Sequence, residues 1–414
     1  MRKILIATMG GTSAPVVESI NDSNYEEILI VTTEENRGLY ESDIKSAAEK
    51  NRAAALLKII KDHEAPEETF TVISKKIAKY YRESYSGSDI YVNITGGTKA
   101  MAAGALYAAV SRGVGNCIYV GGTKREKVTG RVITGYGTIK KTRLSELLID
   151  SKIKEVKMLF NSMEYDAAVK TADAAEKEIG IALNSDLILG FLRNLAEAYG
   201  YWDKMLYDTA AEAFQKIKVS DEIESELPVN FEKTLNMAKE AVNKAAKSRF
   251  YALIDKYFAA LRYMDKGYYM IAVEMFYSAA EFAADYILEK EYGLDKSNID
   301  ILKALKYKGA DKIWLEKFRN EKNKKIQMPL FNSYELLEKM GNEYGKEFIK
   351  NRKYHTALQV RNDMIHGNKP VDKKAAAGLA EVSREMIEKF CGFYSQEKTK
   401  TLEKIGERFR FPKI

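Results

Sequence analysis

Arg361 and His366, five positions apart near the end of the chain, are the residues whose types best suit catalysis. Histidine titrates near neutral pH and can donate or accept a proton, whereas arginine keeps its charge and binds phosphate in a forked geometry. On one regular helix the two side chains would lie about 140° apart, so a single helix does not bring them together. A pocket shared by two antiparallel copies of the helix would. The residue types therefore suit proton transfer at a phosphate, and the spacing is compatible with a pocket shared by two copies of the chain.

The residues around this pair fit the end of a helix. Gly367 is suited to a helix C-terminal cap, and Pro370 follows at the expected distance. His366 would then lie at the negative end of the helix dipole, which favours its protonated form. Asn362 could orient the phosphate or a hydroxyl group.

The same side chains suit the cleavage of RNA without a metal ion. The 2′-hydroxyl attacks the adjacent phosphorus, which requires a proton relay and a cation beside the charged transition state. No acidic cluster with metal-ligand spacing accompanies the motif, so we expect no metal site. The alternative is a surface ion pair between Arg361 and Asp363. The two other histidines, His63 and His355, are expected on the surface.

The segment from Arg361 to His366 resembles the R-x(4–6)-H motif of HEPN ribonucleases, in its Arg-Asn-x-x-x-His form. The resemblance implies an all-helical domain in which two protomers form one composite catalytic site. It assigns catalytic roles to Arg361, Asn362 and His366.

Two clusters of glycine and threonine follow predicted strands near the start of the chain. They are Thr-Met-Gly-Gly-Thr-Ser at 8–13 and Asn-Ile-Thr-Gly-Gly-Thr-Lys at 93–99. Ligands of open α/β sheets bind outside the carboxyl ends of the strands, where glycines admit a phosphate and helix N-termini favour anions. Lys99 adds a positive charge. Neither cluster is a dinucleotide fingerprint or a complete P-loop, and ordinary tight turns are the alternative.

The second cluster, followed by Ala-Met-Ala-Ala, resembles the hallmark loop of CARF domains, and the first resembles their first ligand loop. CARF domains are Rossmann-like sensors that pair as dimers and bind a ring of linked adenylates across the two-fold axis. The resemblance covers about residues 1–140. The ligand contacts that it implies are Thr8, Gly10, Gly11, Thr12, Thr95, Gly96, Gly97, Thr98 and Lys99.

The patterning that must position these residues changes once along the chain. Apolar runs at 4–7, 28–32, 70–73, 90–94 and 117–120 predict strands, and 42–61 and 99–112 predict helices. This alternation predicts an α/β Rossmann-like domain at 1–144, closed at one edge by a hairpin over 119–136. Helical patterning then predicts an all-α bridging domain at 145–245 and an all-α domain carrying the HEPN motif at 246–414.

A basic segment, residues 301–330, lies between the bridging helices and the motif. Nine basic side chains face three acidic ones there: Lys303, Lys306, Lys308, Lys312, Lys317, Arg319, Lys322, Lys324 and Lys325 against Asp311, Glu316 and Glu321. Trp314 and Phe318 are interleaved. The segment either guides an RNA backbone and stacks bases, or is a solvated helix face with both aromatic residues in the core.

Composition narrows the class of protein. The two cysteines, Cys117 and Cys391, are far apart and fit a reducing cytosol, which argues against zinc sites and disulfides. No run reaches the roughly 20 apolar residues that span a bilayer. The first apolar run is interpreted as a strand rather than a signal peptide. We therefore expect a cytoplasmic protein without a membrane partner. A net charge of +7 permits a nucleic-acid partner without requiring one.

A sensor and a HEPN domain in one chain of this size resemble the stand-alone Csm/Csx-type ribonucleases of type III CRISPR defence. The resemblance implies a homodimeric endoribonuclease, activated by cyclic oligoadenylate, that cuts single-stranded RNA without a cofactor or a stable DNA complex. Cyclic tetra-adenylate is favoured over hexa-adenylate. Some relatives slowly cleave their activator, and the sequence leaves this open.

Two other functions compete with the ribonuclease. The first is a non-catalytic CARF regulator that binds nucleic acid or a protein partner and should contain a winged helix-turn-helix with strands. The second is a toxin-like HEPN protein controlled by something other than cyclic adenylate.

Overall fold

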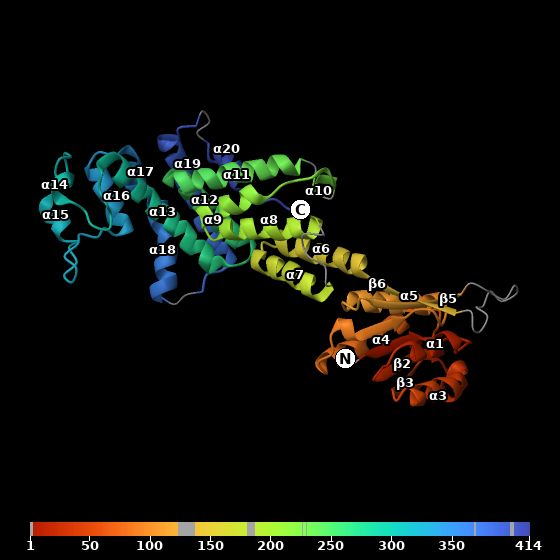
Figure 1. The fold of residues 1–414 in the computed structure, drawn as a ribbon. Helices are drawn as coiled ribbons and strands as arrows, with labels where there is room; N and C mark the ends of the chain where they lie inside the picture. Colours follow the sequence, from red (N-terminus) through yellow and green to blue (C-terminus); the bar gives the residue numbers. More distant parts are fainter. Residues whose placement is uncertain are drawn as a thin grey trace. The chain divides into compact units, whose positions relative to one another are not determined.

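A computed structural model describes residues 3–122, 137–179, 187–225, 227–228, 230–367, 370–397 and 401–414 (Figure 1). The chain divides into two compact units. The first unit comprises Met1–Lys157 and Ala168–Arg193, and the second comprises Met158–Ala167 and Asn194–Ile414.

The first unit is built on one six-stranded sheet with the strand order β3-β2-β1-β4-β5-β6. The strands are β1 (Ile4–Thr8), β2 (Glu27–Thr33), β3 (Ala54–Ile60), β4 (Ile90–Asn93), β5 (Asn116–Gly122) and β6 (Gly137–Arg143). Neighbouring strands are parallel except for the antiparallel pair β5 and β6. From β1 the chain adds β2 and β3 toward one edge of the sheet, and then returns to add β4, β5 and β6 on the other side of β1. The switch point of this Rossmann-like sheet therefore lies between β1 and β4.

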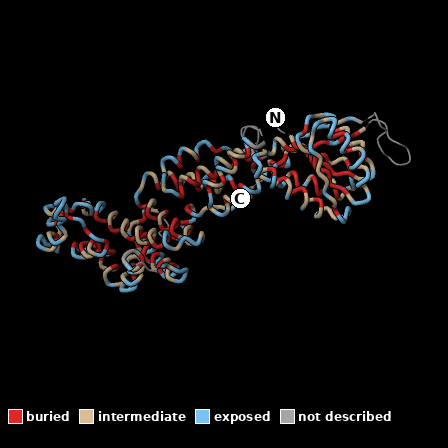
Figure 2. Tube along the Cα trace, turned by 90° about the horizontal axis from the view of Figure 1, so that it is seen from below, coloured by how far each residue is buried: buried red, intermediate tan, exposed pale blue. Residues whose placement is uncertain are grey.

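Helices pack against both faces of the sheet. Because successive strand residues point to opposite faces, Leu5 and Ala7 pack with α1 and α3, whereas Ile4 and Ile6 pack with α4 and α5. Figure 2 shows the buried backbone that runs along these strands. The helical elements are α1 (Ala14–Asp22), η1 (Glu34–Asn36), α2 (Arg37–Leu39), the π-helical turn η2 (Tyr40–Ile44), α3 (Lys45–Lys50), α4 (Pro66–Arg82), η3 (Gly87–Asp89) and α5 (Lys99–Ser111).

Two predicted elements of this unit are wrong. Residues 70–73, predicted as a strand, lie in α4, because Pro66 and the acidic residues of the first turn favour a helix start there. Its buried residues Ile73, Ile77 and Tyr80 recur at helical spacing. Residues 54–60, predicted as the end of a helix, form the edge strand β3. The predicted hairpin over 119–136 overlaps the end of β5, and its remaining residues, 123–136, lie outside the described residues. β5 pairs antiparallel with β6, which follows the predicted range.

Helices account for nearly all of the regular structure described after β6. Those of the bridging region are α6 (Ser145–Asn161), α7 (Tyr165–Ile179), α8 (Leu187–Asp203), α9 (Tyr207–Lys216), α10 (Asp221–Ser225) and α11 (Phe231–Lys247). They are followed by α12 (Arg249–Asp265), α13 (Tyr269–Tyr292), α14 (Ile301–Ala304), α15 (Lys312–Glu316), α16 (Leu330–Lys339), α17 (Glu343–Lys350), α18 (Arg352–Gly367), α19 (Lys373–Tyr394), α20 (Leu402–Gly406) and η5 (Glu407–Phe409). The predicted helical half is confirmed. None of the helices in the described ranges is long and apolar enough to cross a membrane.

A buried charge cluster fixes α12 within the second unit. The Arg262 side chain, only 7% exposed, donates to Asp203 at 2.9 Å and to Asp255 at 3.3 Å. The Trp202 ring N–H also donates to Asp255, at 2.9 Å. The guanidinium carbon of Arg262 lies 3.9 Å from the ring centroid of Phe411, near the C-terminal end. Charged groups this deeply buried are retained only when they are paired, so the cluster joins helix and C-terminal segment in one arrangement.

Candidate functional sites

The two glycine clusters touch at the carboxyl edge of the sheet. The register places Ala7 of β1 beside Asn93 of β4, so that both strands end side by side. A methyl group added at Gly96 would lie 2.4 Å from the Thr8 carbonyl oxygen, and one added at Gly10 would lie 3.1 Å from the Gly97 Cα. The loops are thus in direct contact at the switch point, where an open α/β sheet binds its ligand.

Three threonine hydroxyls of these clusters are occupied by the protein itself. The Thr8 hydroxyl donates to the carbonyl of Gly96 at 2.6 Å. The Thr95 hydroxyl accepts from the Val120 amide at 2.7 Å. The Thr98 hydroxyl caps α5 by accepting from its backbone and donates to the His63 carbonyl. These hydrogen bonds fix the loops in place, so the three residues lie in the site as supports.

The groups that face solvent at this edge suit an anion. Gly11, Gly97 and Lys99 are exposed, and Gly10 and Thr12 are half-buried. Gly97 has φ +83°, a conformation that glycine adopts without strain. Lys99 is the first residue of α5, whose first turn carries no acidic residue. Backbone amides at the helix start and one free-standing ammonium group therefore favour a phosphate here.

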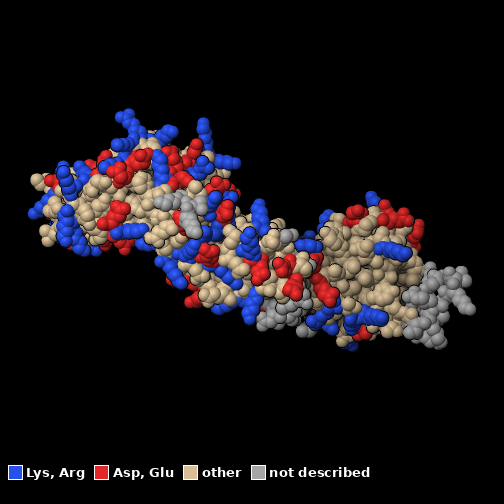
Figure 3. Space-filling view, turned by 90° about the horizontal axis from the view of Figure 1, so that it is seen from above, with Lys and Arg blue, Asp and Glu red and all other residues tan. Residues whose placement is uncertain are grey.

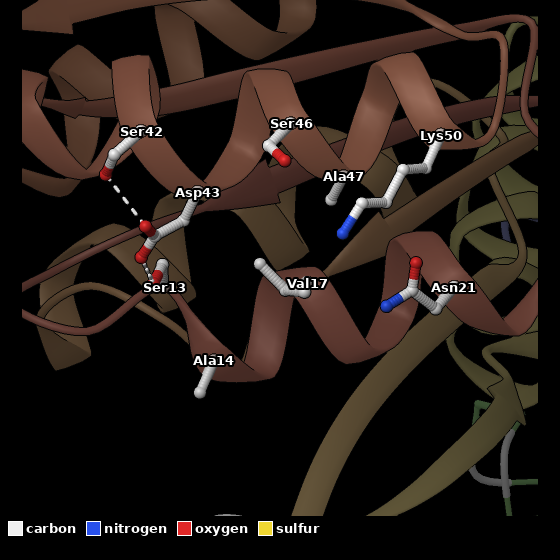
Figure 4. A pocket seen from close by; sticks show the side chains of 9 residues that line it. All are labelled: Ser13, Ala14, Val17, Asn21, Ser42, Asp43, Ser46, Ala47 and Lys50. Carbon is white, nitrogen blue, oxygen red and sulfur yellow. Dashed lines mark hydrogen bonds between the residues drawn. The ribbon is translucent and has the colours of Figure 1, made fainter.

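A polar groove opens beside the first cluster, between α1 and the segment of η2 and α3 (Figure 4). Its volume is ≈ 340 Å³. Ser13 and Ser42 donate hydrogen bonds to Asp43 at one end, which lowers the pKa of that carboxyl group. Lys50 and Asn21 lie at the other end. The groove offers an ionised acceptor and a cation next to the edge where the two glycine clusters meet.

Arg361 is held in a defined orientation by α13. Its Nε atom lies 3.3 Å from Oε1 of Glu274, and its guanidinium carbon lies 4.6 Å from the ring centroid of Tyr277. Burial raises the pKa of the Tyr277 hydroxyl, so this ring is neutral at physiological pH. The Arg361 side chain remains 27% exposed. The guanidinium group is therefore oriented on one side and accessible for a phosphate.

The other two motif residues lie on the same helix. Asn362 is half-buried, one position after Arg361. The backbone of His366 belongs to α18, which is described as far as Gly367, whereas the His366 side chain lies outside the described residues. The role of Gly367 as a C-terminal cap stays a prediction, because residues 368–369 lie outside the described residues. Because α18 packs on α13 and α19, the motif is placed on a helix supported by the core of the second unit.

Sequence reasoning missed Glu274 and Tyr277, the two partners of Arg361. Both residues belong to α13, and Glu274 is 87 positions before Arg361 in the sequence. Nothing in the local sequence pattern marks either residue as a partner of the arginine. His355 also differs from its prediction as a plain surface residue. It is half-buried, its ring lies 4.8 Å from that of Phe331, and its Nε2 lies 3.2 Å from the Phe348 carbonyl oxygen. Its ring thus packs on the protein, between the exposed Phe331 and the buried Phe348.

Three family models match successive parts of the chain. Residues 14–161 match the Card1 CARF domain, residues 148–247 the Csm6 6H domain and residues 241–390 the Csm6 HEPN domain. The first match includes the second glycine cluster but begins after the first. The last match includes the Arg361 segment and Glu274.

Solved structures give a similarity over the whole chain. Csm6 from Enterococcus italicus, bound to cyclic hexa-2′-fluoro-hexa-dAMP, is similar over 99% of both chains, with 12% identity and a TM-score of 0.55. This likeness concerns the fold. Can2 from Sulfobacillus thermosulfidooxidans, in complex with cyclic tetra-adenylate, covers 51% of this chain and 68% of its own, with 11% identity and a TM-score of 0.27. No curated protein sequence matches significantly.

Proposed function

The chain belongs to the CARF–HEPN proteins of type III CRISPR systems, and from this premise we propose that it is an endoribonuclease switched on by cyclic oligoadenylate. The observation that carries the proposal is the setting of Arg361. Its half-buried guanidinium group is oriented by Glu274 of α13. Arg361 itself precedes His366, at the end of the same helix α18, by five positions. A phosphate-binding cation and a proton-transfer group then occur together in the HEPN-type domain, which follows a CARF-type domain in the sequence.

The proposed reaction is an internal transesterification of RNA. The 2′-hydroxyl oxygen bonds to the adjacent phosphorus, and the bond from phosphorus to the 5′-oxygen breaks. The products are a 2′,3′-cyclic phosphate and a 5′-hydroxyl. His366 transfers the proton, Arg361 stabilises the charge on the phosphoryl oxygens, and Asn362 orients the phosphate. Two protomers of a homodimer supply one composite site, and no metal ion takes part.

The proposed sensor is the edge where the glycine clusters touch. A ring of adenylates on the two-fold axis would place its phosphates against Gly10, Gly11 and Gly97, and each protomer would contribute one Lys99. Thr12 would contact the ring directly, whereas Thr8, Thr95, Gly96 and Thr98 would act by fixing the loops. We favour cyclic tetra-adenylate over the hexa-adenylate ring. The division into domains at 144 and 245 is part of the same proposal.

The competing regulator has less support. A winged helix-turn-helix requires strands, and within the described part of the second unit the only β pairing is the single bridge between Arg319 and Ile326. We therefore keep the ribonuclease as the function and treat the regulator as the outcome of a negative cleavage test.

The decisive experiment is cleavage of a labelled single-stranded RNA by the full chain, alone and with cyclic tetra- or hexa-adenylate. We expect slow cleavage alone and fast cleavage with the tetra-adenylate, unchanged by excess EDTA, with cyclic phosphate ends. Binding of an activator without any cleavage would support the regulator. Cleavage at a rate that neither cyclic tetra-adenylate nor cyclic hexa-adenylate changes would indicate a HEPN nuclease that is controlled by something else. Loss of cleavage in EDTA, restored by magnesium, would contradict the metal-free reaction.

A further inference from the structure

The net charge of the protein is concentrated in one small part of the second unit. The basic segment, residues 301–330, has nine basic and three acidic side chains, so it contributes +6 of the net +7 of the whole chain. In the view of Figure 3, blue side chains gather at the end where Figure 1 places α14 and α15. All nine basic side chains are exposed. The remaining 384 residues are therefore almost neutral overall.

The lysines of this segment lack the salt bridges that several lysines elsewhere in the second unit form. Lys244, Lys296 and Lys389 each form salt bridges with two carboxylates. Within the described ranges, no salt bridge joins any of the eight lysines of the basic segment to a carboxylate. Arg319 is the exception, because two of its three guanidinium nitrogens, Nε and Nη2, contact Glu316. Unpaired surface charge of one sign favours an external polyanion.

The segment is folded and presents this charge on a fixed surface. Leu315, Ile326 and Met328 are buried beneath it. A methyl group added at Gly309 would lie 2.0 Å from the Lys339 carbonyl oxygen, so the loop after α14 packs closely on the end of α16. Trp314 packs edge-on against Phe318, with ring centroids 5.0 Å apart. Both rings are half-buried and belong to this small core. The exposed lysines, rather than the rings, are therefore the side chains that a ligand would contact.

The surface lies at the opposite end of α13 from the catalytic arginine. Tyr277, which contacts Arg361, is near the start of α13, whereas the basic segment follows the end of the helix at Tyr292. A rise of 1.5 Å per residue makes the intervening helix roughly 22 Å long. Phosphates of a stacked strand are about 3.4 Å apart, so this length corresponds to about six nucleotides.

We infer that the basic segment is a second RNA-binding surface, which holds the backbone of the substrate several nucleotides away from the scissile bond. The inference rests on the proposed ribonuclease for the identity of the polyanion. It predicts that long RNA is bound more tightly than the catalytic pocket alone allows, through phosphates and with little sequence preference. A tetranucleotide would reach the catalytic residues without reaching the lysines.

The test compares two triple variants of the full chain. The first, Lys303→Gln/Lys306→Gln/Lys308→Gln, removes three charges from the segment. The control, Lys233→Gln/Lys247→Gln/Lys404→Gln, removes three exposed charges elsewhere in the second unit. Each is combined with His366→Ala, and binding of a labelled single-stranded RNA is measured over a range of salt concentrations. Because one phosphate contact contributes about 0.7 to the salt slope, the slope should fall by about 2 in the first variant only.

A second measurement ties the surface to substrate length. In otherwise wild-type protein with activator, the first triple variant should lower kcat/KM for long RNA roughly tenfold or more, and leave a tetranucleotide unaffected. An unchanged salt slope would overturn the inference and leave the surface to a protein partner. An equal loss for the tetranucleotide would overturn it too, by indicating damage to the catalytic site. The binding measurement needs no cleavage, so a protein that binds RNA through these lysines but never cuts would contradict only the ribonuclease.

Discussion

Glu274 lies against the guanidinium group of Arg361, with 3.3 Å between its Oε1 and the arginine Nε, although the two residues are 87 positions apart. The contact joins α13 to α18 and fixes the direction in which the guanidinium points. Glu274 is thus a positioning residue for the proposed reaction, and its removal should affect the rate more than the affinity for substrate.

Glu274→Gln should lower the single-turnover cleavage rate roughly tenfold to a hundredfold, because a poorly oriented guanidinium stabilises the transition state less well. KM and the activator concentration for half-maximal rate should stay close to wild type. Glu289→Gln, which removes a carboxylate from the same helix that pairs with Arg249, is the control. If Glu274→Gln lowers the melting temperature together with the rate, the contact is merely structural.

His366→Ala should abolish RNA cleavage, because it removes the proton-transfer group of the motif. Activator binding, measured by calorimetry, should be unchanged. His355→Ala provides a comparison, since its ring contacts Phe331 and a backbone carbonyl of the interior. Cleavage at a normal rate by the His366 variant would remove this residue from the site.

Lys99→Ala should shift the activation curve to roughly ten- to a hundredfold higher activator concentration. The ammonium group stands at the start of α5, and a symmetric ring would meet it twice in a dimer. Saturating activator should restore the full rate, because the ligand acts by favouring the active arrangement. An unshifted curve would exclude Lys99 from the ligand site. Absence of any dependence on cyclic oligoadenylate would defeat the sensor hypothesis itself.

Gly96→Ala should weaken activator binding by about five- to a hundredfold, since overpacking costs on the order of 1–3 kcal/mol. Its methyl group would lie 2.4 Å from the Thr8 carbonyl oxygen, so the two clusters would have to separate. Gly38→Ala is the matched control, because a methyl group there meets nothing within 4 Å. Calorimetric titration with cyclic tetra-adenylate distinguishes the two, and equal affinities would show that the loop contact does not matter for binding.

Arg262→Leu should destabilise the second unit by about 3–5 kcal/mol, because Asp255 would remain buried without a cation and Asp203 would keep only Lys266. Arg249→Gln on the same helix removes an exposed pair with Glu289 and should cost less than about 1 kcal/mol. Urea unfolding followed by far-UV circular dichroism measures both. Similar midpoints for the two variants would contradict the role of the buried cluster.

The parts of the sites that are local in sequence could be predicted. The glycine clusters were placed correctly at the ends of β1 and β4, because short-range backbone geometry determines them. The contact of Gly10 with Gly97 could not, since it depends on which strands become neighbours.

Tertiary context also decided the elements that were predicted wrongly. The apolar run 70–73 is rich in β-forming residues but forms part of α4, with Ile73 on its buried face, and 54–60 is rich in helix formers but pairs with β2. Glu274 illustrates the same limit within a site. A carboxylate on a helix is ordinary until the fold brings Arg361 to it.

The contact between the two glycine clusters has a mechanical consequence. The first cluster leads into α1 and the second into α5, and these helices cover opposite faces of the sheet. With no side chain between Gly10 and Gly97, neither loop has room to move toward the other while the other stays in place. A ligand that pushes one loop toward the other must therefore move both, and the loops lead into the helices on the two faces of the sheet.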